Sequence, residues 1–122
     1  MKSMLIPLVL LTAPASAEDW QYFAVTSDGR YLSDDDTFRV VGTGEHDDYS
    51  VDVQIKNFDS GEKFRIAISL TDCLRYGNGA LLLVPASGQP QQLAWDAKRH
   101  QWLDLAGRKL CEWAKTQATA TN

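Results

Sequence analysis

The chain has 122 residues and a formal net charge of −4 at pH 7, and 44% of its residues are hydrophobic. This length suits one small domain with a single core. The acidic total argues against nucleic acid as a partner, because phosphate contacts need a basic face. Acidic residues dominate residues 18–60 and basic residues dominate residues 61–122. Such asymmetry can mark a partner surface, although more often it only confers solubility.

Residues 1–17 have the pattern of a secretory signal peptide. Lys2 is followed by the apolar run Met4–Leu11 and by the small-residue sequence Ala15-Ser16-Ala17. That order of charged, apolar and small residues predicts cleavage after Ala17. The apolar run is about half the roughly 20 residues that a membrane-spanning helix needs, so we expect no membrane span. Residues 18–122 are therefore predicted to form a single exported domain, periplasmic or extracellular.

Alternating apolar and polar residues predict an antiparallel sheet in the middle of the chain. Val51, Val53 and Ile55 fall on one face of a strand, and Phe64, Ile66 and Ile68 repeat the pattern after the turn "DSGE". Two such runs joined by a glycine-containing loop are typical of a hairpin. Further strands are expected at residues 20–25, 30–33, 37–41, 80–84, 91–95 and 101–103, and the continuous apolar run 80–84 is expected to be buried.

The C-terminal segment changes to helical spacing. With Asp104 as a candidate N-cap, the pattern predicts a helix over about residues 105–118 and a frayed tail at residues 119–122. Ala106, Leu110 and Ala114 share its apolar side. Gly107 weakens the helix by about 1 kcal/mol relative to alanine. The predicted fold class is thus α+β, with six to eight short antiparallel strands and one C-terminal helix.

Both cysteines, Cys73 and Cys111, lie in the predicted exported part. In an oxidising compartment, two cysteines without a C-x-x-C motif indicate one structural disulfide. Such a bond would pin the helix to the sheet and stabilise the fold by about 4 kcal/mol. The alternative is a pair of free thiols that take part in metal binding.

Two acidic clusters flank the segment at residues 37–41. Asp34, Asp35 and Asp36 come before it, and the loop residues Glu45, His46, Asp47 and Asp48 come after it. A five-residue strand separates the clusters by about 16 Å, too far for them to share one metal ion. We expect the aspartates to act as turn formers and expect no metal or cofactor. The loop residues Glu45, His46, Asp47 and Asp48 are the candidate partner-binding residues.

No motif for catalysis is present. The sequence lacks a G-x-S-x-G elbow, a glycine-rich phosphate loop and an H-E-x-x-H pair, so we expect no enzyme activity. The four tryptophans Trp20, Trp95, Trp102 and Trp113 can anchor partners in binding modules. We expect them instead to fill the space between sheet and helix.

Ordered features along residues 18–122 resemble the surface-adhesin protein E family of small exported Gram-negative proteins. They are Trp20, the segment "YLSDDDTFRVVG", an alternating strand, "TDCLRYGNGALLL", Trp102 and the final Cys111. The resemblance implies a curved antiparallel sheet with a helix held against it by a disulfide. It also implies an adhesin-like role, but no adhesive motif transfers, and the signal lacks a lipoprotein cysteine.

Two functions from different classes follow. The first is a non-catalytic exported protein-interaction module, adhesin-like if the resemblance holds. The second is a periplasmic inhibitor or immunity protein that caps a basic, lysozyme-like hydrolase, because acidic residues 18–60 would steer a cationic partner.

Overall fold

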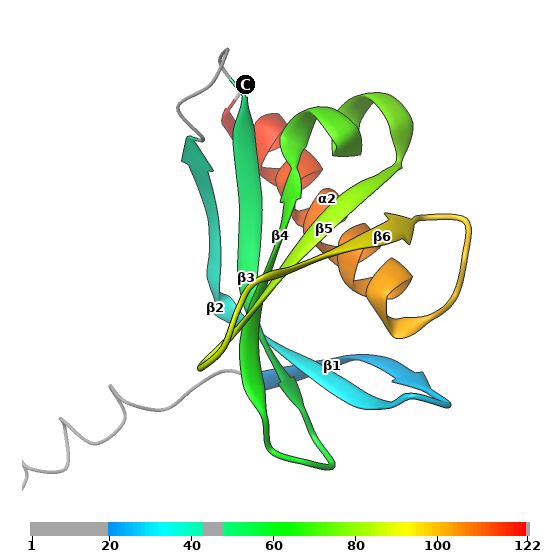
Figure 1. The fold of residues 1–122 in the computed structure, drawn as a ribbon. Coiled ribbons are helices and arrows are strands. Elements are labelled where there is room, and N and C mark those ends of the chain that lie inside the picture. Colours follow the sequence, from blue (N-terminus) through cyan, green and yellow to red (C-terminus); the bar gives the residue numbers. More distant parts are fainter. Residues whose placement is uncertain (1–19, 43–47, 122) are drawn as a thin grey trace, which may run out of the picture.

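A computed structural model describes residues 20–42 and 48–121, with side chains as far as Gln117. Six antiparallel strands form one sheet in the order β1-β2-β3-β4-β5-β6. The elements are β1 (Trp20–Thr26), β2 (Gly29–Gly42), β3 (Tyr49–Asn57), β4 (Lys63–Ser69), the π-helical turn η2 (Asp72–Tyr76), β5 (Asn78–Pro85), β6 (Gln91–Asp96) and α2 (Trp102–Thr121). The sheet curls into a half-barrel and α2 packs on it, which confirms the predicted α+β class (Figure 1). The predicted signal peptide lies outside the described residues.

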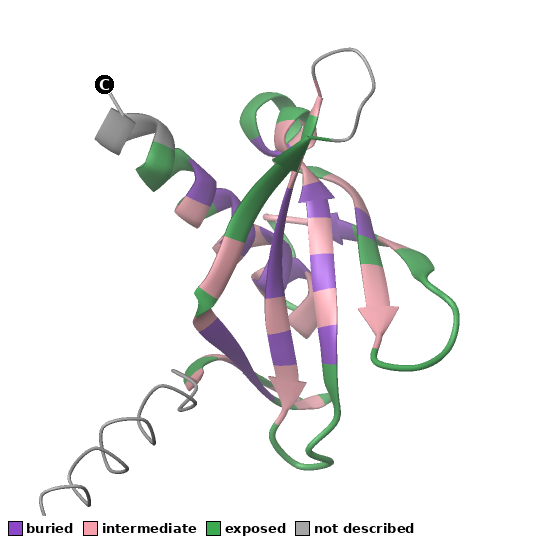
Figure 2. Cartoon of the chain, turned by 90° about the vertical axis from the view of Figure 1, so that its left-hand side faces the viewer, coloured by how far each residue is buried: buried purple, intermediate pink, exposed green. Residues whose placement is uncertain are grey.

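The predicted central hairpin is confirmed as β3 and β4. Val51 pairs with Ile68, Val53 with Ile66 and Ile55 with Phe64. All six of these side chains are buried, whereas their neighbours along β4 are partly exposed (Figure 2). An antiparallel strand with alternating apolar and polar residues is suited to burying one face, which here packs against α2.

The predicted strands at residues 30–33 and 37–41 are two halves of one long strand, β2. The first half pairs with β1 and β3, whereas the second half pairs with β3 alone, and the register shifts between Asp34 and Arg39. At the shift, the Thr37 hydroxyl donates to the Asp34 carbonyl at 2.7 Å and accepts from the Gln54 amide at 2.9 Å. The aspartates therefore sit in a bulge that bends the strand, rather than before its start.

The expected last strand at residues 101–103 is wrong, because α2 already begins at Trp102. Asp104 is not a cap outside the helix but a buried residue in its first turn, only 1% exposed. Its carboxylate accepts from the Asp96 amide at 3.0 Å, from the Gln101 amide at 3.1 Å and from the Arg99 guanidinium at 3.0 Å. These bonds fix the turn between β6 and α2. The local sequence pattern alone did not reveal these bonds.

The helix also extends further than predicted, through Thr121, so residues 119–121 belong to it. Only Asn122 of the expected frayed tail lies outside the described residues. Within the part of the chain that the structure describes, no helix is long and apolar enough to cross a membrane.

The predicted disulfide between Cys73 and Cys111 is present, and both cysteines are buried. It ties α2 to η2, the turn between β4 and β5. The sequence indicated only a tight turn at "YGNG"; the structure places a π-helical turn before it, closed by Gly77 with a φ of 72°. Glycine adopts this left-handed conformation without steric cost.

Three of the four tryptophans fill the space between sheet and helix, as predicted. Trp95 is 1% exposed. Trp102 stacks on Tyr31 with ring centroids 4.2 Å apart, and Trp113 stacks on Phe38 at 5.1 Å. Trp20 differs, because its ring lies beneath Lys56 rather than against α2.

Candidate protein-binding face

The helix covers one face of the sheet and leaves the other uncovered by any described element. We call this surface the open face; it consists of the side chains of β2–β6 that point away from α2. One row crosses five strands by direct pairing: Arg39, Asp52, Ala67, Leu82 and Gln92. The open face is therefore a surface whose side chains are held in place by hydrogen-bonded strands.

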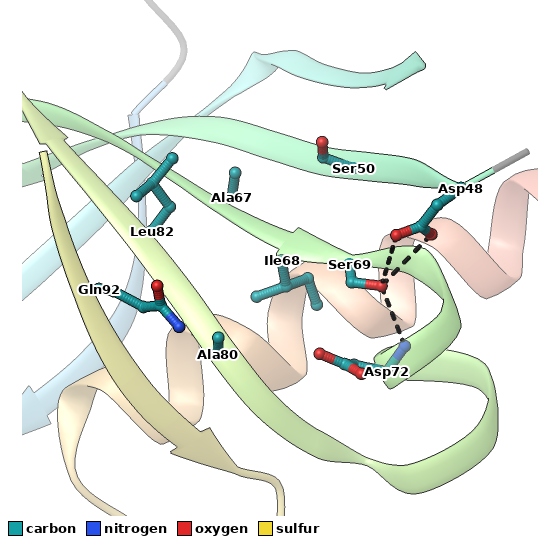
Figure 3. A pocket seen from close by; sticks show the side chains of 9 residues that line it. All are labelled: Asp48, Ser50, Ala67, Ile68, Ser69, Asp72, Ala80, Leu82 and Gln92. Carbon is teal, nitrogen blue, oxygen red and sulfur yellow. Dashed lines mark hydrogen bonds between the residues drawn. The ribbon is translucent and has the colours of Figure 1, made fainter. Parts of the chain in front are cut away.

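Small and apolar residues form the floor of the open face near the end where Asp48 and Ser69 lie. Ala67 and Ala80 leave a hollow of about 290 Å³ beside Leu82, and the hydrogen-bonded Asp48 and Ser69 close one end (Figure 3). A second hollow of about 290 Å³ continues over Val84 toward β2. The two hollows share Ser50, Ala67 and Leu82, so together they form one shallow groove across the strands.

The exposure of Leu82 corrects the expectation that residues 80–84 are buried on both sides. Leu81 points into the core and is 0% exposed, whereas Leu82 on the open face is 42% exposed. Leu82 is not isolated, because Val84 and the 40% exposed Val41 line the same groove, and contiguous apolar surface is a feature of partner-binding sites. The continuous apolar run was thus the one signal in the sequence that could have located this surface.

A charged triad lies beside the groove. Asp52 accepts from Arg39 Nε at 2.8 Å and also from Arg65 Nη2. Arg65 Nη2 donates in addition to the Thr37 carbonyl at 3.1 Å, while its Nε is buried without a hydrogen-bond partner in the described structure. One carboxylate between two guanidinium groups leaves a net positive charge at this point.

Aromatic and basic side chains gather where β1, β2, β3 and β4 end. This cluster, which we call the basic end, consists of Trp20, Tyr22, Arg30, Lys56, Phe58 and Lys63. The Lys56 ammonium lies 4.6 Å and the Lys63 ammonium 5.7 Å from the centroid of the Trp20 ring. The Arg30 guanidinium lies 4.5 Å from the centroid of Phe58, whose ring is 5.7 Å from that of Tyr22.

Arg30 also pairs with Asp59 across the turn between β3 and β4. The Arg30 Nε donates to the Asp59 carboxylate at 3.0 Å. Their hydrogen bond holds the pKa of the Asp59 carboxyl below its ordinary value. The same bond raises the pKa of the Arg30 guanidinium above its ordinary value. Both groups are solvent-exposed, so this pair orients the turn more than it stabilises the fold.

Of the predicted partner-binding loop, only Asp48 lies within the described residues; Glu45, His46 and Asp47 lie outside them. The Asp48 carboxylate accepts from the Tyr49 amide at 2.8 Å, from the Thr71 hydroxyl at 3.2 Å and from the Ser69 hydroxyl at 3.4 Å. It therefore closes the end of the groove by bonding the chain itself (Figure 3).

The carboxylates of the other acidic cluster are similarly engaged by the chain. Asp34 is 4% exposed and accepts from the Asp36 amide at 3.3 Å. Asp35 accepts from the Ser33 hydroxyl at 2.7 Å and lies 3.8 Å from the Lys109 ammonium. Bonds from carboxylate to nearby backbone and hydroxyl groups are those of turn-forming aspartates. Within residues 20–42 and 48–121, no three metal-ligating side chains come together.

No family model, curated protein or solved structure matched this chain in comparisons with known proteins. The resemblance to the surface-adhesin protein E family stays a prediction that depends on the sequence features and on the fold they imply.

Proposed function

We propose that the protein is an exported, non-catalytic module that binds a partner protein on its open face. The observation that carries the proposal is the groove across β2–β6, where Leu82 is 42% exposed over a floor of alanines. A shallow, partly apolar groove on a rigid sheet suits an extended protein segment better than a small substrate.

Export and the adhesin-like role are part of the same proposal. The disulfide between Cys73 and Cys111 supports export, because such bonds persist in oxidising compartments. The curled sheet with its helix and disulfide agrees with the fold that the resemblance implies. A host-surface protein is accordingly the first partner to test.

The inhibitor hypothesis is supported less well. It relied on the acidic residues 18–60 to steer a basic hydrolase, yet within them Asp34 and Asp52 are buried and the Asp48 carboxylate bonds Ser69 and Thr71. The open face meanwhile carries Arg39, Arg65 and the basic end, which would repel a cationic enzyme.

A matched pair of leucine substitutions tests the proposed surface. Leu82 lies in the groove and Leu74 lies on η2, and they are 42% and 55% exposed. We expect Leu82→Glu to reduce binding of host matrix proteins, measured by surface plasmon resonance, by about tenfold or more, since it places an unpaired charge in the apolar groove. Leu74→Glu adds the same charge elsewhere and is expected to leave binding unchanged.

Equal losses in both variants would contradict a site on the open face. Capture of a basic hydrolase in place of matrix proteins, unaffected by Leu82→Glu, would favour the inhibitor hypothesis. Thermal unfolding of both variants checks that each still folds.

A further inference from the structure

The charges along the open face indicate the chemistry of the partner. From the second hollow to the basic end, the basic side chains are Arg30, Arg39, Lys56, Lys63 and Arg65. The carboxylates along this stretch are Asp34, Asp52, Asp59 and Glu62, the last two in the turn between β3 and β4, whereas Asp48 and Asp72 line the first hollow. Asp34 is 4% exposed and Asp52 is 8% exposed, so at the second hollow water meets Arg39 far more than Asp52. Asp59 differs, because its side chain is 45% exposed and that of its partner Arg30 is 48% exposed. A chain that is acidic in total thus presents a basic stretch on its uncovered sheet face.

The exposed cation nearest the groove is Arg39. Its side chain is 59% exposed, whereas that of Asp52 is 11% exposed. The hydrogen bonds of Arg39 to Asp52 run from Nε, at 2.8 and 3.1 Å, and not from its terminal nitrogens. A guanidinium with free donors beside an apolar hollow matches a carboxylate whose neighbouring side chain is apolar.

We infer that the open face binds an extended, acidic segment of a partner protein. Its apolar side chains occupy the second hollow, over Val41, Leu82 and Val84 and away from Asp48 and Asp72, and its carboxylates face Arg39 and the lysines of the basic end. This inference rests on the proposed function and adds the charge of the partner to it. The seven residues of β4, which run from the basic end to the groove, span about 20 Å and define the length of segment that fits.

An acidic protein segment suits this surface better than a polyanionic glycan. Ala67 and Leu82 line both hollows, Ala80 adds to the first, and Val41 and Val84 add to the second, whereas Asp48 and Asp72 also line the first. Apolar side chains bind such a floor, whereas a sulfated sugar chain offers it nothing to bury. The aromatic rings of Trp20 and Phe58 are already covered by Lys56 and Arg30, so they offer little stacking surface to sugars.

The test uses three fluorescein-labelled peptides measured by fluorescence polarisation against the full protein. The first is Gly-Glu-Leu-Glu-Ser-Glu-Leu-Glu-Gly, and the others replace every Glu with Gln or with Lys. We expect saturable binding of the Glu peptide, at least tenfold tighter than that of the Gln peptide, and no binding of the Lys peptide. Raising the salt concentration should weaken the binding, because the site is solvent-exposed.

Arg39→Glu should weaken binding of the Glu peptide by about tenfold or more. Lys98→Glu, in the turn after β6, makes the same change in net charge away from the open face and should leave binding within about twofold. Circular dichroism confirms that both variants fold.

Preference for the Gln or Lys peptide, absence of saturable Glu-peptide binding, or equal losses in both variants would overturn the inference. Heparin that displaces the peptide and binds more tightly would also overturn the inference, because it would assign the surface to a glycan. If Leu82→Glu still abolishes capture of a protein partner in those cases, the proposed function stands and only the partner's charge is wrong.

Discussion

Replacing Gly107 with alanine is expected to destabilise the protein, although alanine favours helices by about 1 kcal/mol. A Cβ at this position would lie 2.5 Å from two ring carbons of Trp95. Trp95 is 1% exposed and cannot move aside, so α2 must shift away from the sheet. Overpacking of this kind costs about 1–3 kcal/mol or more. Urea unfolding should therefore show a net loss of about 1–2 kcal/mol in the free energy of unfolding.

A double-mutant cycle attributes that loss to the contact. In a Trp95→Leu background, which itself costs several kcal/mol of packing, Gly107→Ala should become neutral or stabilising because the ring is gone. Gly42→Ala is the control, because among the described residues a Cβ there would meet Tyr49 at 3.6 Å, an ordinary contact distance. A stabilising effect of Gly107→Ala in the wild-type background would show that α2 does not approach Trp95 this closely.

Removing the disulfide is expected to have the largest effect on stability. The bond joins residues separated by 38 positions, and closing a loop of that size stabilises a fold by about 4 kcal/mol in the chain-entropy model. That is a large share of the roughly 5–15 kcal/mol that holds a typical domain together. The Cys73→Ala/Cys111→Ala variant should unfold at a much lower urea concentration than the wild type.

The reduced wild type serves as the control for this prediction. With a reductant present, its unfolding midpoint should fall close to that of the double variant, and the variant itself should not respond to reductant. If the oxidised wild type and the double variant unfolded at the same midpoint, the disulfide would contribute nothing, and the tie between α2 and η2 would be dispensable.

Alternation and helical spacing sufficed to predict the elements that bury one face. The hairpin of β3 and β4 shows this, because Val51–Ile55 and Phe64–Ile68 are read in steps of two. The predictions that failed concern features decided by tertiary contacts. "QWL" looked like a strand, yet Trp102 enters the helix because it stacks on Tyr31 and because Asp104 bonds the preceding turn.

Gly107 shows the same limit at a single residue. In sequence it only weakens a helix, whereas in the fold it lies so close to Trp95 that a Cβ would come within 2.5 Å of the ring. No local pattern reports a contact between a helix and a strand. The role of Asp104 was missed for the same reason, since a pattern that predicts a turn at "DAKRH" does not show that Asp104 bonds Asp96 and Arg99 within it.

The proposed site differs from the loop that the sequence indicated. The sequence pointed to the acidic loop, because charge density is visible along the chain. The open face is not visible in that way, since its basic residues come from separate strands and meet only through the register that aligns Arg39 with Asp52 and Gln54 with Arg65. The one local indication of the open face in the sequence is Leu82, an apolar residue at an outward-facing position of its strand.

Site-specific photocrosslinking tests most directly whether the open face is the binding surface. A benzophenone side chain is placed at Leu82 in one variant and at Glu112, an exposed residue of α2, in the other. Each variant is irradiated with host matrix proteins and the adducts are identified by mass spectrometry. We predict a partner adduct from Leu82 and none from Glu112; an adduct from Glu112 alone would place the binding surface on the helix and contradict the account.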